Sequence, residues 1–101
     1  MKAMEQEYTM RERLNRYEIA QETIGFMMAM RTEAIHDEAK KATPDAAKIA
    51  QWEAEFTRYD DELYGLRLHD DEAIQRVLDE YCPIVKAEYE RSRVAAASQR
   101  P

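Results

Sequence analysis

Residues 49–66 read IAQWEAEFTRYDDELYGL, and this stretch decides the fold class. Its apolar side chains recur at alternating spacings of three and four residues: Ile49, Trp52, Phe56, Tyr59, Leu63 and Leu66. This spacing places them on one face of an α-helix, because the helix makes a turn about every 3.6 residues. The residues on the opposite face are charged or small. The stretch therefore predicts a helix that packs along one apolar seam, as in coiled coils.

Turn signals bound this helix on both sides. Upstream, Thr43 suits an N-cap and Pro44 suits the first helical position, where its missing N–H is not needed. Downstream, Asp70 suits the N-cap of another helix. These turns divide the chain into three helices, over about residues 3–42, 44–68 and 71–97. Because the linkers are short, we expect an all-α, three-helix up-down-up bundle with a long first helix.

The third helix contains a proline. Apolar residues form one stripe along it, and the stripe keeps its phase across Pro83: Ile74, Val77, Leu78, Tyr81, Val85 and Tyr89. Pro83 falls on the opposite, solvent-facing side, where water can satisfy the carbonyl group that loses its partner. We therefore expect one helix, kinked at Pro83. We expect residues 1–101 to form a single helical domain with a frayed C-terminal tail at residues 95–101.

The first helix has apolar residues on two opposite faces. One stripe contains Met10, Leu14, Tyr17, Ile24, Met28 and Ile35, flanked by Ala20 and Met27. The other face carries Tyr8, Ile19, Phe26 and Met30, with Thr23 between them. One face can pack on the rest of a small domain, whereas the second needs a further partner. Because small soluble proteins most often form symmetric homo-oligomers, we expect a homodimer with Tyr8, Ile19, Thr23, Phe26 and Met30 at its interface.

Composition narrows the function classes. The 101 residues carry 21 acidic and 15 basic side chains, a net charge of −6, and no window forms the basic face that nucleic-acid binding requires. No apolar stretch is long enough to cross a membrane, and the N-terminus is too charged for a signal peptide, so we expect a cytoplasmic protein. With one cysteine, Cys82, the chain cannot form an internal disulfide.

No motif in the sequence identifies an enzyme. The leading hypothesis is a non-enzymatic protein–protein interaction module, such as an adaptor, small chaperone or inhibitor, with no catalytic residues, metal or cofactor. One alternative is a small all-helical metal binder or metal-dependent enzyme that uses Glu33 and His36, an E-x-x-H pair, or the acidic residues around His69. Another is an acidic mimic of nucleic acid that inhibits a basic partner.

Overall fold

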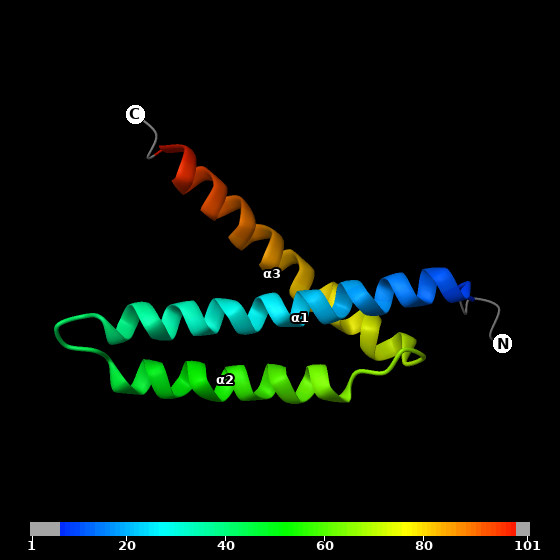
Figure 1. Cartoon of the computed structure of the whole chain (residues 1–101), viewed down its shortest axis with the longest axis horizontal. Coiled ribbons are helices and arrows are strands. Elements are labelled where there is room, and N and C mark those ends of the chain that lie inside the picture. Colours follow the sequence, from blue (N-terminus) through cyan, green and yellow to red (C-terminus); the bar gives the residue numbers. More distant parts are fainter. Residues whose placement is uncertain (1–6, 99–101) are drawn as a thin grey trace.

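Three helices make up the part of the chain that the structure, a computed structural model, describes, residues 7–98. They are α1 (Met10–Ala39), α2 (Ala46–Gly65) and α3 (Asp71–Ser98), and residues 7–98 contain no strand. Figure 1 shows α1 and α2 side by side in opposite directions, with α3 crossing α1 obliquely. The predicted all-α fold of three helices is confirmed.

The first helix begins later than the sequence pattern predicts. The predicted start near residue 3 lies outside the described residues, and residues 7–9 are not helical. Thr9 caps α1: its hydroxyl accepts a hydrogen bond from the backbone N of Glu12 (3.1 Å), and the Glu12 carboxylate accepts one from the backbone N of Thr9 (2.9 Å). This reciprocal capping box satisfies two N–H groups that would otherwise lack partners and fixes the helix start at Met10.

The turn between α1 and α2 is longer than predicted, because α1 ends at Ala39 and α2 begins at Ala46. Asp45, rather than Thr43, is the N-cap of α2, because its side chain accepts hydrogen bonds from the backbone N of Ala47 and Lys48. Glu38 holds the turn in place: it is 5% exposed, accepts a hydrogen bond from the backbone N of Asp45 (3.0 Å) and pairs with Lys41 (2.9 Å).

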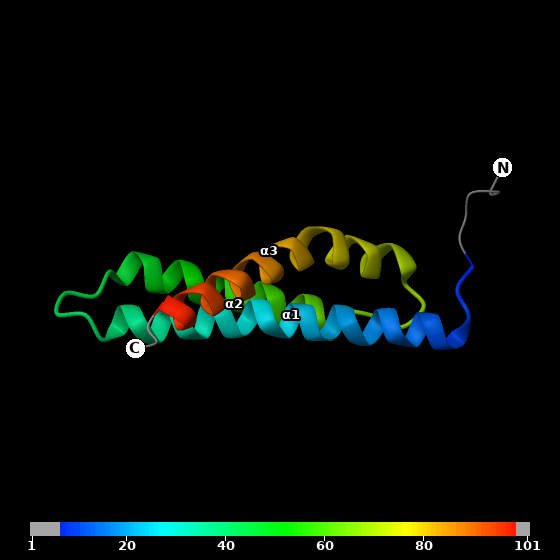
Figure 2. The ribbon, with the colours of Figure 1, turned by 90° about the horizontal axis from the view of Figure 1, so that it is seen from above.

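The third helix behaves largely as predicted. The Asp70 side chain accepts a hydrogen bond from the backbone N of Ala73 (3.0 Å), as an N-cap does. The helix continues through Pro83 as one element, and Figure 2 shows it changing direction along its course. Residues 95–98, where we expected fraying, belong to α3, and residues 99–101 lie outside the described part.

The core forms where α1 meets both other helices. Its members are Ala20, Ile24, Met27, Tyr59, Leu66, Ile74, Val77 and Tyr81. Among the described residues, α2 and α3 meet through long side chains rather than by close backbone approach. The Tyr59 and Tyr81 rings pack edge to face with centroids 5.5 Å apart, and the Tyr81 hydroxyl donates a hydrogen bond to Glu62 (2.7 Å). Burial and this bond raise the pKa of Tyr81 to about 12.

The predicted core stripe of α1 is buried only in the middle of the helix. Ile24 is fully buried, whereas Met10 and Leu14 are 58% and 44% exposed. Figure 1 shows why: the first turns of α1 extend beyond the end of α2. The α1 side chains therefore contribute unequally to stability, and their positions along the helix decide how much.

We predict that Ile24→Ala lowers the free energy of unfolding by roughly 2–5 kcal/mol, because it leaves a cavity in the core. Met10→Ala, made on the exposed part of the same stripe, should change it by less than about 0.5 kcal/mol. Urea unfolding followed by circular dichroism measures both values. Equal losses would show that the first turns of α1 are packed in solution.

The buried Glu38 carboxylate predicts a pH-dependent stability. Its hydrogen bonds with Lys41 and the backbone of Asp45 hold its pKa below the ordinary value of 4.5. A lowered pKa contributes stability that is present above the ordinary value and is lost as pH falls through the lowered one. Glu38→Gln should therefore melt at a lower temperature than the unchanged protein at neutral pH, and the difference should shrink as pH falls through the lowered pKa of Glu38. A difference in melting temperature that does not change with pH would contradict this role of the Glu38 carboxylate.

Candidate functional site

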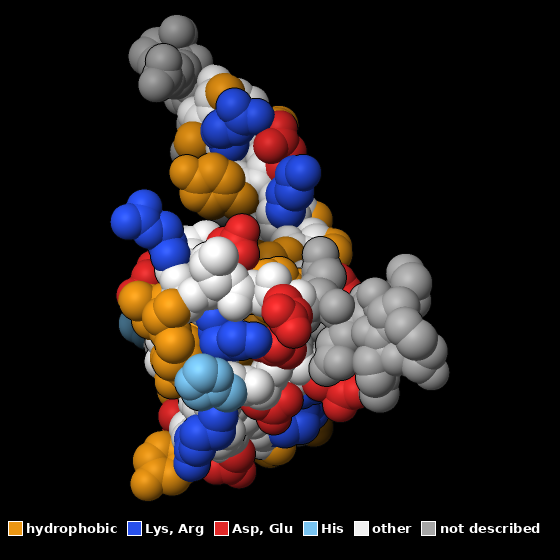
Figure 3. Space-filling view, turned by 90° about the vertical axis from the view of Figure 1, so that its right-hand side faces the viewer, with side chains coloured by type: hydrophobic (Ala, Val, Ile, Leu, Met, Phe, Trp, Pro, Cys, Tyr) orange, Lys and Arg blue, Asp and Glu red, His pale blue; other side chains and the backbone are white. Residues whose placement is uncertain are grey.

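The second half of α3 stands apart from the rest of the molecule. Val85 still packs partly against the core, but every residue from 89 to 98 is exposed. We call residues 84–98 the arm. Figure 3 shows the arm as a projection that carries hydrophobic side chains among charged ones of both signs. Its exposed hydrophobic residues are Ile84, Tyr89 and Val94, at 44%, 65% and 60%.

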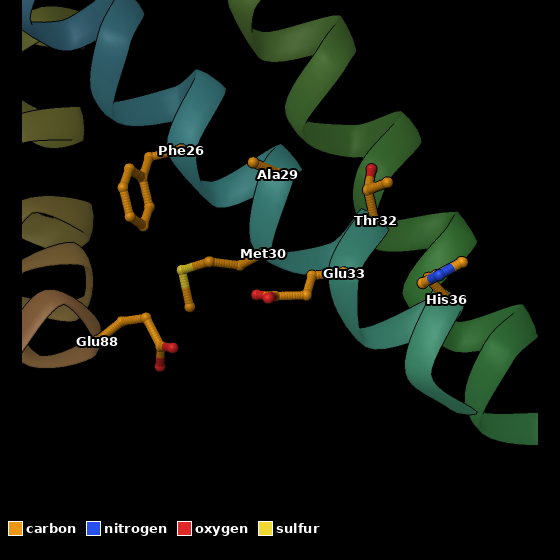
Figure 4. Close-up of a pocket in the computed structure, with 7 residues that line it drawn as sticks. All are labelled: Phe26, Ala29, Met30, Thr32, Glu33, His36 and Glu88. Carbon is orange, nitrogen blue, oxygen red and sulfur yellow. The ribbon is translucent and has the colours of Figure 1, made fainter. Parts of the chain in front are cut away.

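An open hollow lies between α1 and the arm. It has a volume of about 590 Å³ and is lined by Phe26, Ala29, Met30, Thr32, Glu33, His36 and Glu88. In Figure 4, Phe26, Met30 and Glu33 extend from α1 toward α3, which contributes Glu88. We call this hollow the groove. Its lining combines apolar side chains with two carboxylates, a composition suited to a helix with apolar and basic residues.

The structure brings together part of the predicted interface. Phe26, 37% exposed, and Met30 line the groove. Ile19 is 40% exposed earlier on α1. These three side chains form a partly exposed apolar strip on α1, and Phe26 and Met30 are the ones that lie at the groove.

The other two predicted interface residues lie elsewhere. Thr23 is only 7% exposed because α3 crosses α1 beside it: its hydroxyl donates to the backbone O of Ile19 (2.7 Å) and lies 3.7 Å from Sγ of Cys82. Tyr8 precedes α1, and the Arg16 guanidinium sits 4.3 Å from the centre of its ring. Thr23 therefore stabilises the helix crossing, and Tyr8 packs at the start of α1.

The residues of the metal-binding alternative lie in two separate places, on α1 and in the turn before α3. Glu33 and His36 both line the groove, but no three His, Cys, Asp or Glu residues within residues 7–98 are grouped so that they could hold a metal ion. Near His69, Asp70 caps α3 and Asp71 pairs with Arg13 (3.0 Å). These acidic residues have structural partners.

Charged pairs lie along the arm. Arg91 pairs with Glu88 (2.6 Å), and Arg93 pairs with Glu90 (2.6 Å) along the arm. The pKa of Arg91 is raised, mainly by its hydrogen bond with Glu88 and to a smaller extent by the charge of Glu33 on α1. Because these pairs are largely exposed, each contributes little stability, and their partners can be exchanged.

The arm was not predicted from the sequence, although the sequence contains a signal for it. After Val85 and Tyr89, the core-facing stripe of α3 continues with the small residues Ser92 and Ala96. Small residues offer little apolar area to a core, so this stretch of α3 gains little free energy from packing against it. The loss of large apolar residues marks where α3 leaves the core.

Comparisons with known proteins give no further guide to this site. No protein-family model, curated protein or solved structure matches the chain. None of the helices within residues 7–98 has the length and apolar character needed to cross a membrane. The groove and the arm are therefore the features from which a function can be inferred.

The exposed arm predicts uneven hydrogen exchange. In dilute solution, the backbone amides of residues 90–98 should exchange at least about tenfold faster than those of residues 74–81, because few apolar contacts hold the arm helical. Hydrogen–deuterium exchange with mass spectrometry measures this ratio. If association covers the arm, the ratio of the exchange rate of residues 90–98 to that of residues 74–81 should fall as protein concentration rises. Equal protection of the two segments at high dilution would contradict the exposed arm.

Proposed function

We propose that this protein is a non-enzymatic interaction module that acts through helical surfaces as a homodimer. One observation carries the proposal: the arm leaves the core with Ile84, Tyr89 and Val94 exposed, and α1 also exposes the apolar residues Ile19 and Phe26. Exposed apolar residues on neighbouring helices beside an open groove are typical of protein–protein contact sites.

The shape of the molecule supports this proposal. Its radius of gyration is 17.2 Å, whereas a compact domain of this length has a radius of gyration of about 13 Å. The principal extents are 59 × 36 × 21 Å. A single chain that stays this extended leaves apolar surface in contact with water, and association removes that surface from water.

The weak attachment of the arm to the core is a second reason to expect a partner. In proteins most of the stability of a helix comes from tertiary packing of its apolar face rather than from intrinsic propensity. The arm spans residues 84–98 and is held to the core only at its beginning. A partner that packs along the arm would stabilise it as a helix.

A charge introduced into the open strip of α1 tests the homodimer. We expect Phe26→Glu to shift the protein from dimer to monomer, because burying an unpaired carboxylate costs several kcal/mol. Tyr64→Glu is the matched control: Tyr64 is 86% exposed on α2, so the same new charge there should leave the dimer intact. Sedimentation velocity measures the mass of both variants, and circular dichroism confirms that both remain helical.

Two results would contradict the proposal. The first is a helical Phe26→Glu variant that dimerises with unchanged affinity, which would place the contact elsewhere. The second is an unchanged protein that sediments as a monomer at every concentration. Because Phe26 is already partly exposed, loss of folding is not the expected effect of the substitution.

A further inference from the structure

We propose that the two copies exchange arms, so that the arm of each copy lies in the groove of the other, around a two-fold axis. This inference rests on the proposed homodimer and specifies which surfaces meet. It makes each groove incomplete until the second copy supplies an arm. The length, side chains and charges of the two surfaces support this arrangement.

The arm and the open face of α1 match in length. The arm, residues 84–98, is about 22 Å long at the rise of an α-helix. The face of α1 that runs from Ile19 to His36 is about 26 Å long by the same measure. One arm can therefore cover most of this face without extending past the end of the helix.

The side chains of the arm suit close packing against the groove. Tyr89, Ser92 and Ala96 share one face of α3 at spacings of three and four residues. Tyr89 supplies a large ring for contact with Phe26 and Met30. The small Ser92 and Ala96 allow the backbone of the arm to approach another helix closely, which larger residues would prevent.

The charges of the two surfaces are complementary. The face of α1 around Phe26 carries Glu22, Glu33 and Asp37 at helical spacing from it. The arm carries three basic residues, Lys86, Arg91 and Arg93, against two acidic ones. In a chain with a net charge of −6, the arm is thus a basic segment that would meet an acidic face.

The two-fold arrangement also explains why the occupant is a second copy. A different helical partner in the groove would leave the exposed residues of the arm in water. Reciprocal exchange instead covers the groove and the arm of both chains in one symmetric contact.

The surface area is sufficient for such a contact. The chain exposes 7735 Å², whereas a compact monomer of this size exposes about 5,900 Å². A stable interface needs about 800 Å² from each partner, which this excess can supply.

Cross-linking between differently labelled chains tests the exchange. In a Cys82→Ser background, one chain carries Phe26→Cys and the other, with an affinity tag, carries Tyr89→Cys. The two are mixed at micromolar concentration with a short bis-maleimide, and links between tagged and untagged chains are counted by mass. The control pairs Tyr89→Cys with Tyr64→Cys, an exposed position on α2. Cys82→Ala replaces Cys82→Ser if the serine background has lost helix content.

We expect the Phe26→Cys and Tyr89→Cys pair to link at least about tenfold more than the control pair, because groups held together in a complex have effective concentrations near the millimolar range. Light scattering on the same mixture gives the mass. A dimer whose two pairs link equally would overturn arm exchange and leave the homodimer in place. A monomeric mass at all concentrations would overturn both arm exchange and the homodimer.

Discussion

The packing of this protein depends on the middle of α1, since α1 contacts both other helices along its backbone and α2 and α3 meet through long side chains. Ala20, Ile24 and Met27 lie at this junction and are almost completely buried. Thr23, bonded to the backbone of its own helix and in contact with Cys82, marks the place where α3 crosses α1. The core is therefore confined to the region of this crossing, and parts of the chain away from it, the arm above all, are exposed.

Polar contacts around the crossing fix how the helices lie relative to one another. Arg31 on α1 pairs with Glu55 on α2 and lowers its pKa. Glu62 on α2 accepts a hydrogen bond from Tyr81 and pairs with Arg76 on α3, whose pKa this pairing raises. Such half-buried pairs restrict the angle between helices more than they add to stability, because desolvation offsets much of their attraction. The direction of the arm follows from this fixed crossing.

The sequence predicted the helices and the second apolar face of α1 because both depend on local spacing. The 3-4 pattern around Trp52 and Tyr59 identified α2, and the unbroken phase across Pro83 identified α3 as one helix. The N-caps at Thr9 and Asp45 were not predicted, since several residues near the start of each helix could serve as its N-cap. The burial of Thr23 and the arm follow from the crossing of α3 over α1, and the exposure of Met10 follows from the extension of α1 beyond α2. Both are tertiary properties that spacing along one helix does not contain. The homodimer and its interface remain predictions, as do a metal site and mimicry of nucleic acid.

The central claim is that this chain has more apolar surface than its own core can cover and that a second copy covers the rest. Static light scattering of the unmodified protein, from micromolar to millimolar concentration, tests it most directly. The account predicts the mass of a dimer that dissociates to monomer on dilution, with no larger species, because a two-fold contact closes on itself. A monomeric mass over the whole range would contradict it and would show that the arm and the groove stay open in solution.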